Sequence, residues 1–177
     1  MEKRTFENLT IKEGEELIFP CDVEVRGNLT INGGILIVAG ELYLSNEDSV
    51  FTIRGGDVSV GSLDTLGCNI QINDSDLYVN GTLNCNSISS DSDILVGGDS
   101  YANHISCLNY IVEGHNHCGN ITAIQDIYIG GDNKSFELTC RDLYVGGNVD
   151  VNYHDITIRG SLYVADGISH CNQIAVG

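Results

Sequence analysis

Several residue types that most protein domains use freely are almost missing from this chain. Its 177 residues include one proline, one methionine and no tryptophan. Only eight lysines and arginines stand against 25 aspartates and glutamates, which gives a net charge of −17. Nucleic acid and anionic lipid surfaces repel so acidic a protein, so neither is an expected partner. The more plausible consequences of the charge are solubility, weak attraction of cations, or a basic partner.

Long apolar runs and paired cysteines are missing as well. No apolar run approaches the ~18 residues of a membrane-spanning helix, and the first 17 residues lack the apolar segment of a signal peptide. The seven cysteines are an odd number and include no Cys-x-x-Cys pair. Buried free thiols in a reducing compartment therefore fit better than a disulfide framework. We expect a cytoplasmic protein that does not cross a membrane.

Helix-forming residues are also sparse, whereas valine, isoleucine, threonine, tyrosine, asparagine, aspartate, serine and glycine abound. These are the residues of short strands and tight turns. Because 42% of the residues are hydrophobic, the chain has enough apolar surface for a core despite its acidity. The composition predicts a single all-β domain.

One short phrase recurs along most of the chain. It reads DLYVGG at Asp142, DIYIGG at Asp126 and DILVGG at Asp93. Nine copies, spaced 16 to 19 residues apart, begin at Asp22, Glu41, Asp57, Asp76, Asp93, Asn109, Asp126, Asp142 and Ser161. A period near 17 residues that continues to the last residue is typical of a solenoid. The repeat assigns residues 22–177 to one solenoid, and residues 1–21 to an N-terminal cap or a degenerate first coil.

Each repeat predicts three short strands. Apolar residues stand at the second and fourth positions of the phrase, a second apolar pair closes most units, and a weaker pair lies between them. Residues two apart share one face of a strand, and we expect glycines to supply the dihedral angles of the corners. The prediction is a single-stranded parallel β-helix of about nine coils with three strands per coil. The usual handedness of parallel crossovers favours a right-handed coil.

With its coil length and its Asp-x-x-Val-x-Gly phrase, the chain resembles the bactofilin class of polymer-forming β-helical proteins. The resemblance covers residues 22–177. It implies a rod-shaped scaffold without an active site.

The stretch EGHNHCGN contains the strongest candidate for a metal site. His115 and His117 alternate along one strand, and the repeat stacks Asp99, His115 and Asp132 in three successive coils. Two imidazoles and two carboxylates suit zinc or a similar divalent cation, so Asp99, His115, His117 and Asp132 form the predicted metal site. The alternative is an exposed corner without a metal. Cys118 is a further possible ligand, although it should point away from His117.

Two further columns run along the repeat. Its first position is acidic in most copies, and these carboxylates either accept hydrogen bonds from backbone N–H groups or hold calcium. Its third position points outward and carries five tyrosines, at Tyr43, Tyr78, Tyr128, Tyr144 and Tyr163. This column either stacks on itself within the sheet or binds a sugar or a protein.

No catalytic constellation is visible, so catalytic and cofactor-binding residues are not predicted. The main hypothesis is a non-enzymatic scaffold that acts through protein contacts and self-association. The alternative is a carbohydrate-binding or carbohydrate-active β-helix that uses the tyrosine and acidic face. The last coil, with Leu162, Val164, Ile168, Ile174 and Val176, should present unpaired strands around an apolar surface. We expect two copies to meet there as a C-terminal end-to-end dimer.

Overall fold

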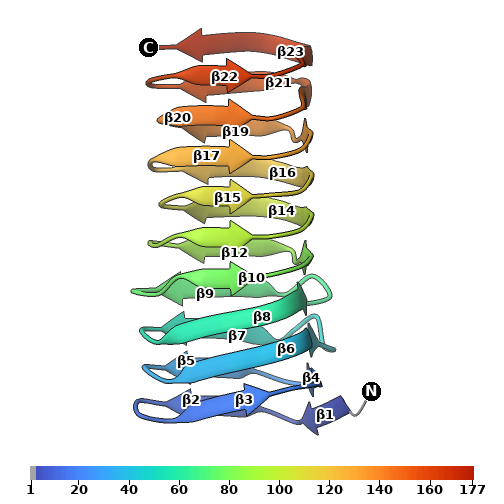
Figure 1. Ribbon diagram of the computed structural model, residues 1–177, viewed down its shortest axis with the longest axis vertical. Coiled ribbons are helices and arrows are strands. Elements are labelled where there is room, and N and C mark those ends of the chain that lie inside the picture. Colours follow the sequence, from blue (N-terminus) through green and yellow to red (C-terminus); the bar gives the residue numbers. More distant parts are fainter. Residues whose placement is uncertain (1–2) are drawn as a thin grey trace.

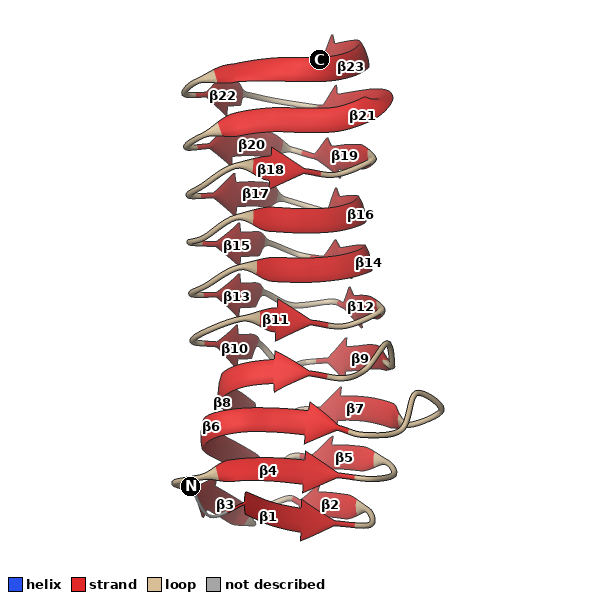
Figure 2. Cartoon of the chain, turned by 90° about the vertical axis from the view of Figure 1, so that its right-hand side faces the viewer, coloured by secondary structure: helices blue, strands red, loops and turns tan. Residues whose placement is uncertain are grey.

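The computed structural model describes residues 3–177 and is an all-β parallel β-helix (Figure 1). Its 23 strands stack in about 10 turns, and every pairing between named strands is parallel. In Figure 1 the chain rises from bottom to top, and the strands nearer the viewer run from left to right. Figure 2 shows the right-hand side of that view, and its nearer strands again run from left to right, which is towards the back of Figure 1. The coil is therefore right-handed, as the sequence predicts.

The strands form three faces, which we call A, B and C. In each turn the chain passes through face A, then face C, then face B. Six strands bend around a corner and contribute to two faces: β6 (Ile35–Leu44) and β8 (Asp57–Asp64) join face B to face A, while β14 (Ser100–Cys107), β16 (Asn116–Ala123), β21 (Asn148–Ile158) and β23 (Gly167–Val176) join face A to face C. Face A also holds β1 (Lys3–Phe6), β4 (Asp22–Val25), β11 (Leu83–Asn84) and β18 (Asn133–Lys134).

The other two faces are built from shorter strands. Face C contains β2 (Leu9–Lys12), β5 (Leu29–Asn32), β7 (Val50–Arg54), β9 (Asn69–Asn73), β12 (Ser87–Ser90) and β19 (Glu137–Cys140). Face B contains β3 (Glu16–Phe19), β10 (Leu77–Val79), β13 (Ile94–Val96), β15 (Tyr110–Val112), β17 (Asp126–Ile129), β20 (Asp142–Val145) and β22 (Leu162–Val164).

The predicted register is wrong in the first two copies of the phrase. From Asp57 onward the copies stack on face B, where Val58 pairs with Leu77. The copies at Asp22 and Glu41 lie on face A instead, with Val23 beside Leu42. All three faces use the same alternation of inward apolar and outward polar residues, so the phrase alone does not identify its face. Residues 3–19 supply β1, β2 and β3, each paired with the next coil, which is why there are about 10 turns instead of nine.

The core is a set of stacked aliphatic columns. Inward residues such as Val58, Ile127 and Val145 are fully buried, or nearly so, in the middle of the rod. The glycines of the repeated phrase do not supply unusual corner dihedral angles, although the sequence predicts that they do. Positive φ angles occur at other glycines, such as Gly55 and Gly67. A Cβ atom on Gly146 would instead clash with the carbonyl oxygen of Gly130 in the coil below. Close approach of successive corners is what requires glycine there.

The cysteines are free thiols, as predicted. Six of the seven are buried, and Cys171 is half-buried. Cys107 pairs with Ala123, so a complete coil separates it from Cys140. Burial raises the pKa of Cys107 and that of Cys140 to about 12, which keeps both thiols protonated and unreactive.

Candidate functional site

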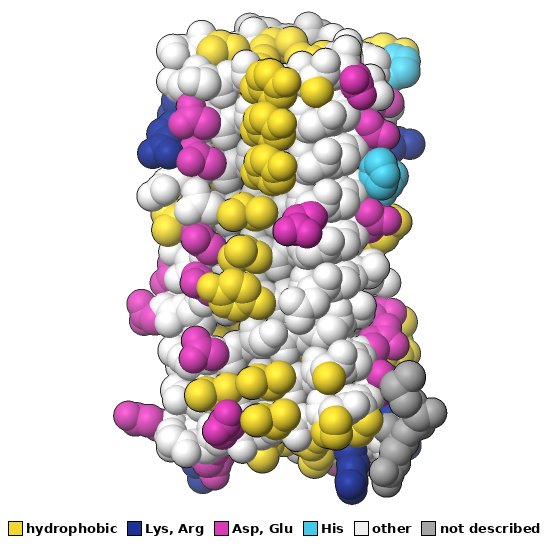
Figure 3. All heavy atoms as spheres, in the orientation of Figure 1, with side chains coloured by type: hydrophobic (Ala, Val, Ile, Leu, Met, Phe, Trp, Pro, Cys, Tyr) yellow, Lys and Arg dark blue, Asp and Glu magenta, His cyan; other side chains and the backbone are white. Residues whose placement is uncertain are grey.

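The most distinctive surface is an outward ridge on face B. It consists of one side chain from each of six successive coils: Tyr78, Leu95, Ile111, Tyr128, Tyr144 and Tyr163. We call this set the tyrosine ridge. In Figure 3 its hydrophobic side chains form a vertical strip in the upper half of the rod. The parallel register places each side chain directly over its neighbour, about 4.8 Å away.

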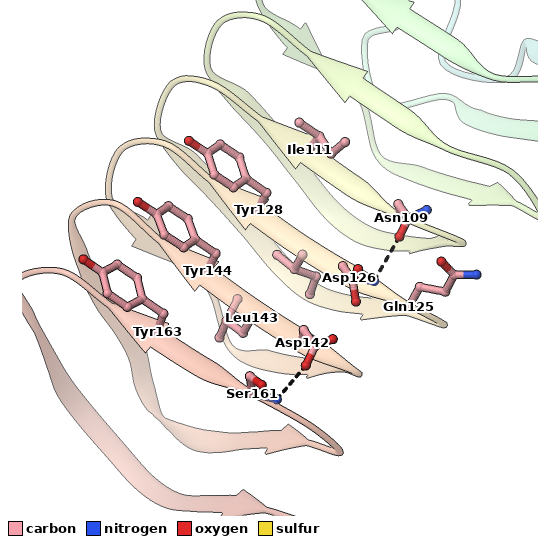
Figure 4. Close-up of a pocket in the computed structure, with 11 residues that line it drawn as sticks. Asn109, Ile111, Gln125, Asp126, Tyr128, Asp142, Leu143, Tyr144, Ser161 and Tyr163 are labelled. Carbon is pink, nitrogen blue, oxygen red and sulfur yellow. Dashed lines mark hydrogen bonds between the residues drawn. The ribbon is translucent and has the colours of Figure 1, made fainter.

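The upper tyrosines stack face to face. The ring centroids of Tyr128 and Tyr144 are 4.8 Å apart with a 4° angle between the rings, and those of Tyr144 and Tyr163 are 4.7 Å apart with a 7° angle. Stacking covers the ring faces and leaves the ring edges and hydroxyl groups outside (Figure 4). A sugar needs a free ring face on which to pack. The geometry therefore confirms the interpretation that these tyrosines stack on one another, and it leaves little aromatic face for a glycan.

A column of polar side chains borders the ridge where face C turns into face B. We call it the corner ladder, and it consists of Asp76, Asp93, Asn109, Asp126 and Asp142. Asp76 Oδ1 accepts a hydrogen bond from the N–H of Asp93 at 3.0 Å, and Asn109 Oδ1 accepts one from the N–H of Asp126 at 3.1 Å. Asp142 Oδ1 likewise accepts from the N–H of Ser161. The predicted backbone hydrogen bonds exist, but each one reaches the next coil instead of the residue's own turn.

Arg141 relieves the charge repulsion at the upper end of the corner ladder. Its guanidinium contacts Asp126 Oδ2 at 2.8 Å and Asp142 Oδ2 at 3.0 Å, so it bridges two successive coils. The N–H of Ser161, and after it the guanidinium of Arg141, hold the pKa of Asp142 below its usual value. Two adjacent carboxylates and one guanidinium leave a local charge of about −1.

A shallow groove runs between the tyrosine ridge and the corner ladder, parallel to the rod axis (Figure 4). Its walls are the edges of Tyr128, Tyr144 and Tyr163 on one side and the Asp126 and Asp142 side chains on the other. The groove is open to solvent along its length. It offers an extended surface with an apolar wall and an acidic wall.

The predicted metal ligands lie at a different corner, where face B turns into face A. The N–H of His115 donates to Asp99 Oδ1 at 2.8 Å, and the N–H of Asp132 donates to His115 Nδ1 at 3.0 Å. Asp132 Oδ1 in turn accepts from the N–H of Asn148 at 2.8 Å. The predicted stack of Asp99, His115 and Asp132 is therefore present, and it forms a second hydrogen-bonded ladder between coils.

His117 does not join that stack. It lies on the outside of face A, and its ring stacks on Tyr101 with centroids 5.2 Å apart. Cys118 is buried, so it points away from His117 as expected. Within residues 3–177 no three histidine, cysteine, aspartate or glutamate side chains lie together as ligands of one metal ion. The hydrogen bonds between coils account for Asp99, His115 and Asp132 without a metal.

Sequence reasoning missed a polar cluster inside the core. Tyr110 is fully buried, and its hydroxyl lies 2.6 Å from Ser100 Oγ and 3.0 Å from Asn116 Oδ1. Asn116 Nδ2 donates to Asn133 Oδ1 at 2.7 Å, and Asn133 Nδ2 donates to Ser135 Oγ at 2.9 Å. These polar side chains satisfy one another, so the cluster presents no unpaired group to a ligand. Their signal in the sequence is the column Ser100, Asn116 and Asn133, which follows the predicted stack by one residue and points into the core.

The corner ladder predicts a measurable loss of stability when one rung is removed. Replacing Asn109 with alanine deletes the acceptor for Asp126 N–H and the donor to Asp93 Oδ1. We expect Asn109→Ala to lower the free energy of unfolding by about 1 kcal/mol, a typical cost for such a hydrogen bond. The matched control is Asn80→Ala, because Asn80 is exposed and lies outside the ladder. Equal losses in the two variants, measured by urea denaturation, would show that the rung does not stabilise the fold.

A second prediction concerns acid. The pKa of Asp142 is lowered in the folded state, so its charged form stabilises the fold above the unfolded pKa of roughly 4. That contribution disappears as the pH falls through the lower folded pKa. We expect the melting temperature of Asp142→Asn to lie below that of the parent at pH 7, and the difference to close as the pH falls below the unfolded pKa and through the lower folded pKa. A difference that stays constant over this range contradicts the assignment.

None of the described residues 3–177 forms a helix long and apolar enough to span a membrane. Comparison with family models, with curated proteins and with solved structures finds no match to this chain. Its function must therefore be argued from the rod, its two ends and the surface of face B.

Proposed function

We propose that this protein is a non-enzymatic scaffold, a rigid rod that self-associates through its C-terminal end. The observation that carries the proposal is the exposure of core positions in the last coil. Ile174 and Val176 occupy the inward slots of Ile156 and Ile158. Their exposed fractions are 41% and 52%, whereas those of Ile156 and Ile158 are 0% and 2%.

The strands of the last coil are also open to a partner. β22 pairs with β20 and β23 pairs with β21, and within residues 3–177 neither has a strand on its other side. Backbone N–H and C=O groups along such an edge favour the addition of another strand. Burying an aliphatic side chain contributes about 1.5–3 kcal/mol, so covering this coil supplies apolar as well as hydrogen-bonding energy.

The N-terminal coil is better covered. Its inward Phe6 and Phe19 rings meet edge to face, with centroids 5.6 Å apart, and both pack against the core. Leu9 and Ile11, in the same coil, are 7% and 0% exposed. This difference between the ends supports a closed tail-to-tail dimer over a filament, because a filament needs two adhesive ends.

Charge and thiol chemistry support the same proposal. Long side-by-side contact between two bodies of charge −17 is unfavourable, whereas the end contact is small and apolar. Six buried free thiols suit a reducing compartment, which supports the proposal of a cytoplasmic scaffold. The resemblance to polymer-forming β-helical proteins agrees with a role in assembly. Carbohydrate binding is the weaker proposal, because the tyrosines that would serve it cover one another's faces.

Light scattering tests the dimer. We expect the intact protein to show the mass of two chains at micromolar concentration, and Val164→Lys with Ile174→Lys to show the mass of one. Two added lysines place charges at the apolar junction, while their long side chains can still reach solvent. The control is Thr122→Lys with Thr157→Lys, which adds the same charge at outward positions of face C. A monomeric parent at high micromolar concentration, or a control that dissociates as readily, rejects the proposal.

A further inference from the structure

The side of the rod carries a second surface that self-association through the end does not use. The tyrosines of the ridge are exposed, with fractions of 41% at Tyr78, 42% at Tyr128 and 53% at Tyr163, while Leu95 and Ile111 between them are half-buried. An outward apolar strip on a rigid sheet is typical of an interaction site. The strip is also pre-organised, because stacking already fixes the upper rings.

The lower half of this surface is strongly acidic. Asp57, Asp76 and Asp93 occupy the same border in three successive coils, and in residues 3–177 no lysine or arginine forms an ion pair with any of them. The hydroxyl of Tyr78 donates to Asp76 Oδ2 at 3.2 Å. The charge of Asp76, followed by smaller contributions that include Asp93 and Asp57, raises the pKa of Tyr78. A negative potential is thus concentrated beside the ridge.

Arg141 shows which group this border binds. Two coils higher than Asp93, its guanidinium bridges Asp126 and Asp142 with four hydrogen bonds of 2.8–3.1 Å. The residues that precede Asp76 and Asp93 in the chain, where Arg141 precedes Asp142, are Ser75 and Ser92. The lower carboxylates therefore lack the guanidinium that the upper pair receives from the chain itself. A guanidinium from a partner suits them, because its planar donors match carboxylates.

We propose that the tyrosine ridge and the acidic border beside it bind an extended, proline-rich segment of another protein that carries arginine at every third residue. The segment lies along the rod axis, with its proline rings against the ring edges and successive arginines on Asp57 and Asp93, which receive no guanidinium from within residues 3–177 of the chain itself.

Spacing selects this class of partner. Asp57 and Asp93 stand two coils apart, so their carboxylates are separated by about 9.6 Å along the rod. A polyproline II helix has three residues per turn and rises ~3.1 Å per residue, so every third side chain repeats at about 9.3 Å on one side. The spacing of successive arginines therefore matches the spacing of these two carboxylates. Aromatic-lined grooves are a common surface for such segments, whose low conformational entropy reduces the cost of binding.

Other occupants fit the surface less well. A second copy of this chain has only eight basic residues and a charge of −17, so it cannot supply the arginines. A glycan would need free aromatic faces, and the upper tyrosines cover theirs. A basic, unstructured partner complements both the apolar ridge and the acidic border. Because the rod is already rigid, binding the partner costs the rod little conformational entropy.

Fluorescence anisotropy with two labelled synthetic peptides of identical composition provides the test. One repeats Arg-Pro-Pro five times, and the other carries its five arginines together followed by ten prolines. We expect the repeating peptide to bind at least about tenfold more tightly, because only its arginines match the coil period. Tyr78→Ser with Tyr144→Ser should weaken its binding about tenfold, and so should Asp57→Asn with Asp93→Asn. Rising salt should weaken binding by the parent.

The matched control is Tyr101→Ser with Tyr153→Ser, which removes two exposed tyrosines away from face B and should leave binding unchanged. Because Tyr78 and Tyr144 point outward, their replacement should not unfold the rod, and circular dichroism checks this. The Val164→Lys with Ile174→Lys variant should bind the peptide like the parent, so failure of the dimer and failure of this site are distinguishable. Equal affinity for the two peptides, equal loss in the control, or no binding at about 1 mM peptide overturns the proposal. Self-association of the parent protein through face B also overturns it. So does tighter binding of a neutral glycan than of the repeating peptide.

Discussion

Every coil of this protein must hydrogen-bond to the coil above it, including at the corners, where no strand provides a partner. Backbone groups meet part of that constraint, as where the N–H of Gly131 donates to the carbonyl oxygen of Gly114, and side chains meet the rest. At one corner Asp76, Asn109 and Asp142 accept hydrogen bonds from backbone N–H groups one coil higher, and at another Asp99, His115 and Asp132 do the same. An aspartate, an asparagine and a histidine share one task because each offers an acceptor at the right distance. The corners thus become part of the rod instead of flexible loops between its strands.

The same register produces the features that we connect with function. Stacking places residues of the same kind over one another in successive coils, which are about 4.8 Å apart. Outward tyrosines therefore form a ridge, and acidic residues at the corners form a charged border. Within residues 3–177, Ile174 and Val176 are exposed at positions that are buried one coil lower. One surface at the end and one along the side are what a scaffold needs to join a copy of itself and a second protein. These proposals are independent, because no residue serves both the end contact and the acidic border.

The sequence was sufficient to predict the parallel β-helix, its three strands per coil and its free thiols, because period, alternation and cysteine count are local properties. The register of the first coils was not predictable in the same way. Val23 and Val58 stand in similar phrases yet lie on different faces, because the chain advances by two faces instead of three between the copies at Glu41 and Asp57. The stacking of Asp99, His115 and Asp132 was predicted, whereas their hydrogen bonds to the backbone of the next coil were not, because capping and metal binding use the same side chains. The cluster around Tyr110 was missed for a different reason: Ser100 and Asn116 were in the correct register, but polar side chains are typical of the surface and these two point into the core.

The central claim is that side chains at the corners bind the coils together, and amide hydrogen exchange measures this directly. The account predicts that the corner amides of Asp93, Asp126 and Asn148 exchange as slowly as strand amides such as that of Tyr128, because carboxylate or amide oxygens accept from them. It also predicts that Asn109→Ala makes the Asp126 amide exchange faster while the Asn148 amide, at the other corner, is unchanged. Corner amides that exchange at the rate of an unprotected loop in the parent protein would contradict it.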